Sequence, residues 1–212
     1  ADWTAPPKAF AGRIIQIDVD GGEIGNNLRV DVGLMGDARL ALRDLLDALQ
    51  AGSPPKRSEA RIEEINRQVS AWWAEQEEKL YADARPIRPQ VVFRVLRELL
   101  PANTVIVADP GTPTPFTAAF FPLRQAGRSV IIPRAHGGLG YAVPAVVGAK
   151  LARPKATVIG LTGDGSFGFS VGELETIVRL GLQVVFVQFN NGAFGWIKEL
   201  QHLHQGSRCF GV

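Results

Sequence analysis

Hydrophobic and polar positions alternate in blocks along the second half of the chain. Short, near-continuous apolar runs, typical of strands buried on both faces of a sheet, alternate with segments whose apolar residues recur at helical spacing. Strands that alternate with helices in this way predict an α/β fold with a parallel sheet flanked by helices. The predicted strands are 104–109, 129–133, 156–163 and 184–190, and the predicted helices are 88–100, 114–121, 141–152, 171–180 and one from about 194.

The N-terminal part predicts a partial second α/β domain. Residues 14–20, IIQIDVD, predict a buried strand, and residues 38–50 predict a helix. The Pro- and Ser-rich stretch GSPPKRSEA then marks a domain boundary, and residues 60–83 predict a long charged helix. We expect Trp72 and Trp73 to pack this helix onto a neighbour, and a ligand platform is the alternative.

Composition narrows the classes of function. With 46% hydrophobic residues the chain can form a sizeable core, and a net charge of +2 without a basic stripe argues against a nucleic-acid partner. The apolar runs are too short to span a membrane, and the first residues, ADWTAPPKAF, lack the layout of a signal peptide. A single cysteine, Cys209, excludes an internal disulfide and fits a reducing compartment, so we expect a cytoplasmic protein.

Oxygen-bearing residues follow two successive predicted strands. GDGS at 163–166 places Asp164 at a strand end, and NNGAFG at 190–195 offers the Asn191 amide oxygen and the Ala193 carbonyl. Three such ligands suit Mg²⁺, but a site with one carboxylate needs a ligand that brings its own negative charge. This pattern indicates a metal bound jointly with a diphosphate, whose oxygens backbone amides near these glycines can also contact. Either turn alone would be equally typical of an ordinary tight turn.

The spacing of the two turns resembles the motif of thiamine-diphosphate enzymes, in the group of acetolactate synthase, benzoylformate decarboxylase and pyruvate decarboxylase. The resemblance implies that Asp164, Asn191 and the Ala193 carbonyl bind Mg²⁺. HGGLGYAVPA at 136–145 resembles the loop beneath the cofactor, with Leu139 as the apolar platform and Gly137 as a carbonyl acceptor. GTPT at 111–114 resembles a turn that touches the diphosphate. The implied cofactor residues are Gly111, Thr112, Gly137, Leu139, Gly163, Asp164, Gly165, Ser166, Asn191, Ala193, Phe194 and Gly195.

The same resemblance implies a division of the chain. Residues 1–52 resemble the C-terminal part of the family's central domain, 53–85 the connecting segment, and 86–212 the diphosphate-binding domain, truncated at its C-terminus. The family's pyrimidine-binding domain, with its activating glutamate, has no counterpart in the sequence. We therefore expect a fragment of a longer enzyme, inactive alone, whose site forms between subunits of a homodimer or homotetramer.

The residues after the metal turn bear on the reaction. The resemblance implies that Trp196 and Ile197 contact substrate, and His136 is a further candidate; the alternative for the first two is a packed helix start. An apolar Ile197 argues against the glutamate of simple decarboxylases, and the Gln-Trp pair typical of true acetolactate synthases is missing. The expected function is an acetolactate-synthase-like lyase or carboligase that acts on a 2-oxo acid.

Two other classes of function stay open. One is a non-catalytic cofactor-binding or structural relative that lacks the activating glutamate. The other is an ordinary nucleotide-binding α/β domain, which the missing GxGxxG after the first strand weakens. Asp18 and Asp20, at the end of the first predicted strand, leave open whether a flavin or adenine nucleotide binds the N-terminal part.

Overall fold

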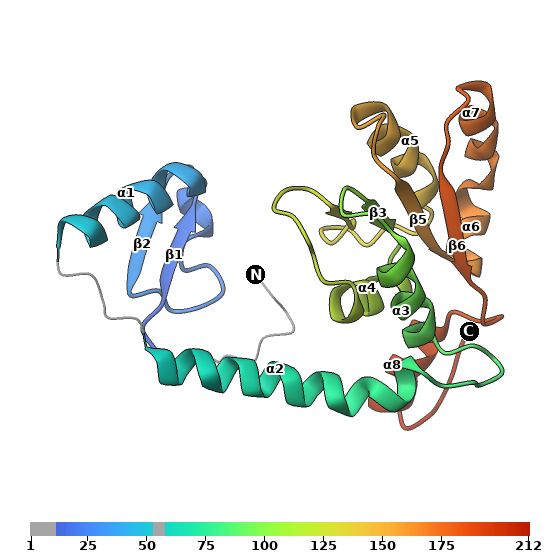
Figure 1. The fold of residues 1–212 in the computed structure, drawn as a ribbon, viewed down its shortest axis with the longest axis horizontal. Coiled ribbons are helices and arrows are strands. Elements are labelled where there is room, and N and C mark those ends of the chain that lie inside the picture. Colours follow the sequence, from blue (N-terminus) through green and yellow to red (C-terminus); the bar gives the residue numbers. More distant parts are fainter. Residues whose placement is uncertain (1–11, 53–57) are drawn as a thin grey trace. The chain divides into compact units, whose positions relative to one another are not determined.

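The computed structural model describes residues 12–52 and 58–212 (Figure 1). The chain divides into two compact units, Ala1–Gln68 and Val69–Val212. The start of the sequence and most of the Pro- and Ser-rich break lie outside the described residues. The predicted division into 1–52, 53–85 and 86–212 therefore stays a prediction. Within the described ranges, no helix is long and apolar enough to cross a membrane.

Unit 1 contains a small parallel sheet and one helix. Strand β1 (Ile15–Asp18) pairs with β2 (Val32–Met35), and a short 3-10 turn, η1 (Gly21–Glu23), follows β1. Helix α1 (Ala38–Ala51) begins where the Asp37 carboxylate accepts hydrogen bonds from two backbone N–H groups of the first turn. Helix α2 (Glu59–Leu80) starts in this unit and continues into unit 2.

The prediction that residues 14–20 form a buried strand was wrong about burial. Ile15 is 56% exposed, because β1 has a single neighbouring strand in a two-stranded sheet and one short helix cannot cover both faces. Strand β2 was not predicted, since its sequence VGLM is short and contains a glycine, which weakens a strand pattern.

Unit 2 is built on a four-stranded sheet in the order β4-β3-β5-β6, with every pairing parallel. This confirms the predicted α/β fold with helices flanking a parallel sheet. The strands are β3 (Val105–Ala108), β4 (Val130–Ile131), β5 (Val158–Gly163) and β6 (Val185–Phe189). The helical elements are α3 (Pro89–Leu99), α4 (Pro113–Phe120), α5 (Ala142–Ala152), α6 (Asp164–Ser170), η2 (Val171–Glu173), α7 (Leu174–Arg179) and α8 (Gly195–His204).

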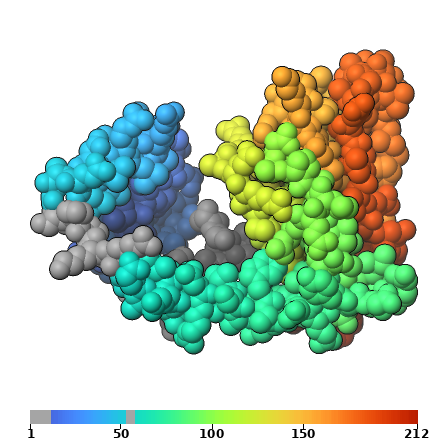
Figure 2. Space-filling model, viewed as in Figure 1, coloured from blue at the N-terminus to red at the C-terminus, as the bar shows by residue number. Residues whose placement is uncertain are grey.

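The two faces of this sheet carry separate apolar cores. Val105 and Val107 of β3 pack with residues of α5 and α7, whereas Ile106 and Ala108 pack on the side of α3 and α4. This alternation follows from the period of two along a strand. Figure 1 shows α5 and α7 grouped apart from α3 and α4, and in Figure 2 the green and yellow atoms of 90–130 form one continuous surface.

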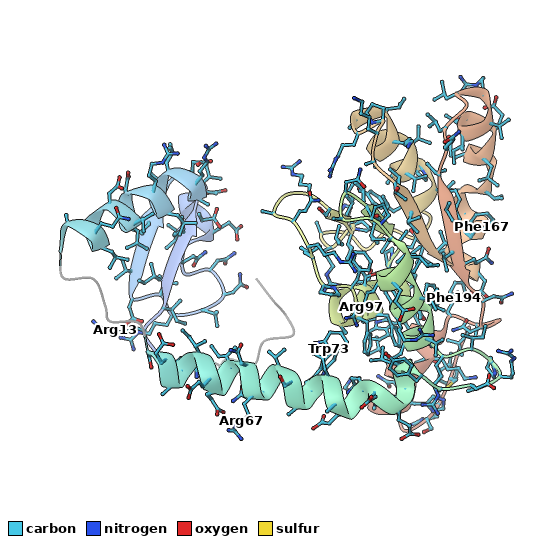
Figure 3. The ribbon with its side chains drawn as sticks, viewed as in Figure 1. Arg13, Arg67, Trp73, Arg97, Phe167 and Phe194 are labelled. Atoms are coloured by element: carbon cyan, nitrogen blue, oxygen red, sulfur yellow. The ribbon has the colours of Figure 1, made fainter. Side chains whose placement is uncertain are left out.

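The tryptophans of α2 pack against unit 2, as the sequence predicted. The Trp72 and Trp73 rings lie 5.4 and 6.2 Å from the ring of Phe120 on α4. The Arg97 guanidinium lies 4.6 Å from the centre of the Trp73 ring, and Figure 3 shows the two side chains as neighbours. The second half of α2 is thus an integral part of unit 2.

The segment after β5 differs from the prediction. Residues 163–166 were predicted as a turn, with the next helix from 171, but α6 begins at Asp164, directly after the last residue of β5. Gly163 keeps an extended backbone and ends the strand, so the chain passes from strand to helix within one residue. The glycines that suggested a turn instead allow close packing: a Cβ on Gly165 would lie 2.8 Å from the Phe194 ring.

A buried carboxyl group lies at the carboxyl end of β3. Asp109 is fully buried, and its Oδ1 accepts a hydrogen bond of 2.9 Å from the N–H of Ala142, the first residue of α5. Its Oδ2 has no hydrogen-bond partner among the described residues. Burial raises the pKa of the Asp109 carboxyl, and the nearby Ser166 hydroxyl and the Ala142 N–H offset part of that rise.

Gly160 in the middle of β5 provides a test of packing. A Cβ there would lie 2.5 Å from two atoms of the Phe186 ring and 3.1 Å from Val146 on α5. We expect Gly160→Ala to lower the free energy of unfolding by about 1–3 kcal/mol, because the core must shift to admit a methyl group. Urea unfolding followed by tryptophan fluorescence measures this change.

Gly148→Ala on α5 is the matched control, because nothing lies within 4 Å of its added Cβ. It should stabilise the protein by up to about 1 kcal/mol through helix propensity. Equal effects of the two substitutions would contradict the packing described for β5 and α5.

Asp109→Asn tests the buried carboxyl. Because the pKa of Asp109 is raised in the folded protein, its neutral form stabilises the fold at low pH, and this stabilisation is lost as pH rises through the folded pKa. An asparagine stays neutral at all these pH values. The free energy of unfolding of the variant relative to that of the parent should therefore rise as the pH is raised from about 4 to about 8. Urea unfolding at both pH values measures the difference, and a constant offset would contradict the raised pKa.

Candidate functional site

The residues predicted from the turns line one cavity at the carboxyl ends of β3, β5 and β6. Its volume is about 310 Å³, which is in the range of small-molecule sites. Parallel strands end at one edge of the sheet, so the segments that follow them meet there. The cavity is lined by Pro110, Gly111, Thr112, Gly137, Leu139, Gly163, Asp164, Gly165, Ser166, Phe189, Asn191, Ala193, Phe194, Gly195, Trp196 and Ile197.

A direct hydrogen bond joins the two predicted metal-binding turns. The Gly192 N–H donates to Oδ2 of Asp164 over 2.8 Å, across the ends of β5 and β6. In the second turn, the Ala193 N–H donates to Oδ1 of Asn191 over 3.2 Å. An amide oxygen has two lone pairs and keeps one for a further ligand. The structure therefore brings Asp164, Asn191 and Ala193 together at one wall of the cavity.

The charge of the cavity is low and of one sign. Asp164 is the only ionisable residue among the described residues that line it, and none of these is a lysine, arginine or histidine. An anionic ligand placed here would meet a carboxylate and no compensating positive side chain. A divalent cation held between the carboxylate and the ligand resolves this conflict, because it attracts both.

Glycine residues at several positions let the backbone itself form part of the cavity wall. Gly192 has a positive φ of 64°, which allows its N–H to reach Asp164. A side chain at Gly195 would collide with the Asn191 amide, and one at Gly165 would collide with the Phe194 ring. Figure 3 shows Phe194 near the lower end of β6, just before α8.

Two serines of α6 hold the backbone of the loop that carries Leu139. Gly140 is buried, its N–H donates to Ser166 Oγ over 2.9 Å, and its carbonyl accepts from Ser170 Oγ over 2.7 Å. Its φ of 81° and the closeness of Phe169, 2.8 Å from an added Cβ, both require glycine. Leu139, one residue earlier, remains 39% exposed and lines the cavity. The loop is thus fixed through its backbone while its apolar side chain stays available.

A second cavity adjoins the first. Its volume is about 590 Å³, and it shares Pro110, Gly111, Gly137 and Trp196 with the first cavity. Trp196 therefore lies where the two spaces meet, and its side chain is 48% exposed. This position is compatible with its predicted substrate contact, which stays a prediction.

Three residues of the site were not predicted. Pro110 and Phe189 line the cavity, and Asp109 lies buried beneath the loop that carries Leu139. Asp109 follows an apolar run as Asp164 does, and this was the available signal. Sequence alone does not reveal that the Asp109 carboxyl is directed to the backbone of α5.

The histidines do not join this cavity. His136 is exposed and does not line it, so its predicted role in substrate binding also stays a prediction. His202 lies on α8 with Nε2 3.7 Å from Cys209 Sγ. Within residues 12–52 and 58–212 there is no cluster of three or more His, Cys, Asp or Glu that could hold a metal unaided.

Comparison with known proteins agrees with this geometry. Residues 109–212 match the family model described as thiamine pyrophosphate enzyme, C-terminal TPP binding domain. The probable acetolactate synthase large subunit of Methanocaldococcus jannaschii is 37% identical over 204 residues, which cover 92% of this chain and 33% of that protein. The acetolactate synthase isozyme 3 large subunit of Escherichia coli is 30% identical, with 92% and 34% covered.

A relative named for a different activity matches over a similar length. The probable sulfoacetaldehyde acetyltransferase of Rhizobium meliloti is 30% identical over 89% of this chain and 34% of that protein. The chain thus spans about a third of the length of these relatives. With its parallel sheet and its cavity at the strand ends, the chain belongs to the thiamine pyrophosphate enzymes of the acetolactate synthase group, and residues 109–212 are the C-terminal TPP binding domain.

Proposed function

We propose that this chain supplies the diphosphate- and magnesium-binding part of a thiamine-diphosphate-dependent lyase or carboligase that acts on a 2-oxo acid. The observation that carries the proposal is the single cavity that gathers Asp164, Asn191 and Ala193 with Leu139. Residues 1–52 and 53–85 are, in this proposal, the end of the central domain and its connection to the cofactor domain at 86–212.

Magnesium binding is proposed from the ligands and the charge. Asp164 offers one carboxylate, Asn191 one amide oxygen and Ala193 one carbonyl, all hard oxygen donors. Mg²⁺ prefers six such ligands, so diphosphate oxygens and water complete the set. Because Asp164 is the only ionisable residue among the described residues that line the cavity, the metal is what makes binding of a diphosphate favourable.

The remaining lining residues have proposed roles in holding the cofactor. Gly111 and Thr112, after β3, and Gly163, Gly165 and Ser166, around the start of α6, face the diphosphate. Phe194 and Gly195 close the metal turn. When bound, thiamine diphosphate supplies a carbanion that attacks a carbonyl and stabilises what remains after carbon–carbon cleavage.

The loop at 137–141 is proposed to set the shape of the cofactor. Leu139 supports its bent middle from one side, and the Gly137 carbonyl accepts a hydrogen bond from the aminopyrimidine. The support for this role is the anchoring of Gly140, which fixes the loop through hydrogen bonds to Ser166 and Ser170.

The substrate side is proposed to lie at Trp196 and Ile197. Both line the cavity and both are about half exposed, which suits groups that meet a small substrate and a second protein surface. We propose a homodimer or homotetramer in which another subunit completes the site and supplies the activating glutamate. If no such glutamate exists in the protein, a non-catalytic cofactor-binding relative is the alternative.

Asp164→Ala tests the metal site. We expect this substitution in the full-length protein to abolish Mg²⁺-dependent binding of thiamine diphosphate, with affinity at least about a hundredfold weaker, because only neutral ligands remain for a divalent ion. Isothermal calorimetry of the protein with the cofactor, with and without Mg²⁺, measures the loss.

Gln188→Ala is the matched control, since Gln188 is exposed on β6, three residues before Asn191, and is not among the described residues that line the cavity. It should keep Mg²⁺-dependent affinity within a few-fold of the parent, whereas Asn191→Ala should weaken it strongly. Unchanged affinity in Asp164→Ala would remove the basis of the proposed function.

The reaction itself requires a substrate screen. We expect the full-length enzyme, of which this chain is proposed to be a part, to release carbon dioxide from at least one of pyruvate, benzoylformate and glyoxylate, because the Ile197 region is apolar and the proposed substrate is a 2-oxo acid. Acyl-CoA acceptors belong in the screen, and product analysis distinguishes aldehyde release from carboligation. Cofactor binding without turnover on any of them would favour the non-catalytic alternative.

A further inference from the structure

The side chains of Asp109 and Thr162 lie next to each other beneath the start of α5. Ala108 pairs with Leu161 in the parallel register, so Asp109 and Thr162 occupy the following positions on neighbouring strands. Val105 and Val107 face α5, and Val158 does the same on β5, so the period of two places Asp109 and Thr162 on that face as well. Both residues are fully buried.

Two polar atoms at this place lack hydrogen-bond partners among the described residues, and they are Asp109 Oδ2 and Thr162 Oγ1. The Oδ1 atom of Asp109 accepts a hydrogen bond from Ala142 N–H, and the Ser166 hydroxyl lies near the same carboxyl group. Burying a carboxyl group in this way is unfavourable for folding, and an apolar side chain of similar size would fill the space at lower free energy. The contribution of Asp109 must therefore lie in what its hydrogen bond positions.

The hydrogen bond from Ala142 N–H to Asp109 lies at the C-terminal end of the loop that carries Leu139. Ala142 is the first residue of α5 and lies three positions after Leu139. Gly140, between them, is held by Ser166 and Ser170 of α6. The loop is therefore fixed from two elements: from β3 through Asp109 and from α6 through the two serines. Ser166 itself lines the cavity, so the same contacts set the distance between the loop and the turn at Asp164.

We propose that Asp109 is a positioning residue that holds the segment 137–142, and with it Leu139, at a fixed position relative to the proposed diphosphate-binding residues after β5. The proposal rests on the proposed function for its consequence in cofactor binding, but the ordering of the loop is a property of the protein alone. Asp109 acts through the backbone of α5 and does not touch the cavity itself.

Three variants separate this role from simple stability. Asp109→Leu is close in size and removes the acceptor, Asp109→Asn keeps an acceptor oxygen, and Thr162→Val removes a buried hydroxyl at the same depth on the neighbouring strand. Hydrogen–deuterium exchange of the protein without cofactor reports on the loop, and calorimetry with thiamine diphosphate and Mg²⁺ reports on binding.

We expect Asp109→Leu to speed amide exchange in residues 137–142 by roughly three- to tenfold, the effect of losing one hydrogen bond. Exchange in the cores of β3 and β5 should stay at the level of the parent. Cofactor affinity should fall by a similar factor, and Asp109→Asn and Thr162→Val should match the parent in both measurements. Should Asp109→Leu not fold, Asp109→Ala also removes the acceptor and gives the same comparison.

Wild-type loop exchange in Asp109→Leu or Asp109→Ala, with only the unfolding free energy changed, would overturn the positioning role. Loop exchange in Thr162→Val equal to that of Asp109→Leu would overturn it too, because the effect would then be one of general packing. Absence of cofactor binding by the parent protein would instead count against the proposed function, and the exchange data would still decide the role of Asp109.

Discussion

The common direction of the strands in unit 2 is the constraint on which the site depends. Because β3, β5 and β6 run parallel, the segments after them emerge at one edge of the sheet, and residues as far apart in sequence as Gly111 and Asn191 line one cavity. The hydrogen bond from Gly192 N–H to Asp164 then joins the ends of β5 and β6 directly. Loops alone would not hold oxygen ligands at the spacing that a small cation needs.

Glycine has two different uses around the cavity. At Gly140 a positive φ and a tight contact with Phe169 are both required, so the backbone can lie against α6. At Gly165 the conformation is ordinary and only the space beside the Phe194 ring matters. The first use shapes the loop and the second lets two elements approach. Both bring backbone groups close enough to line the cavity.

Most of this arrangement could be predicted from the sequence, because fully buried strands give unbroken apolar runs such as the one at 104–109. The positions of Asp164 and Asn191 followed from the same pattern, since polar residues after such runs lie at the carboxyl edge of the sheet, whereas Gly137 and Leu139 came only from the resemblance to a family. The roles of all these residues stay predictions. The exposure of β1 could not be predicted, because the same apolar pattern does not reveal how many strands flank it. Helix α6 was missed because its glycines are typical of turns, and Asp109 because its partner is a backbone N–H on α5.

Asp109 and Asp164 occupy equivalent positions at the ends of two strands, and their different surroundings give them different roles. Asp164 follows β5, lines the cavity and receives a single backbone N–H, so its carboxylate can still bind a cation. Asp109 follows β3 on the face covered by α5, where burial raises its pKa and favours the neutral acid. Asp109 is not among the described residues that line the cavity, and its carboxyl accepts from the backbone N–H at the start of α5, whereas Asp164 is the ionisable side chain among the described residues that line the cavity. The same residue type thus serves the backbone of α5 at one strand end and the cavity at the other.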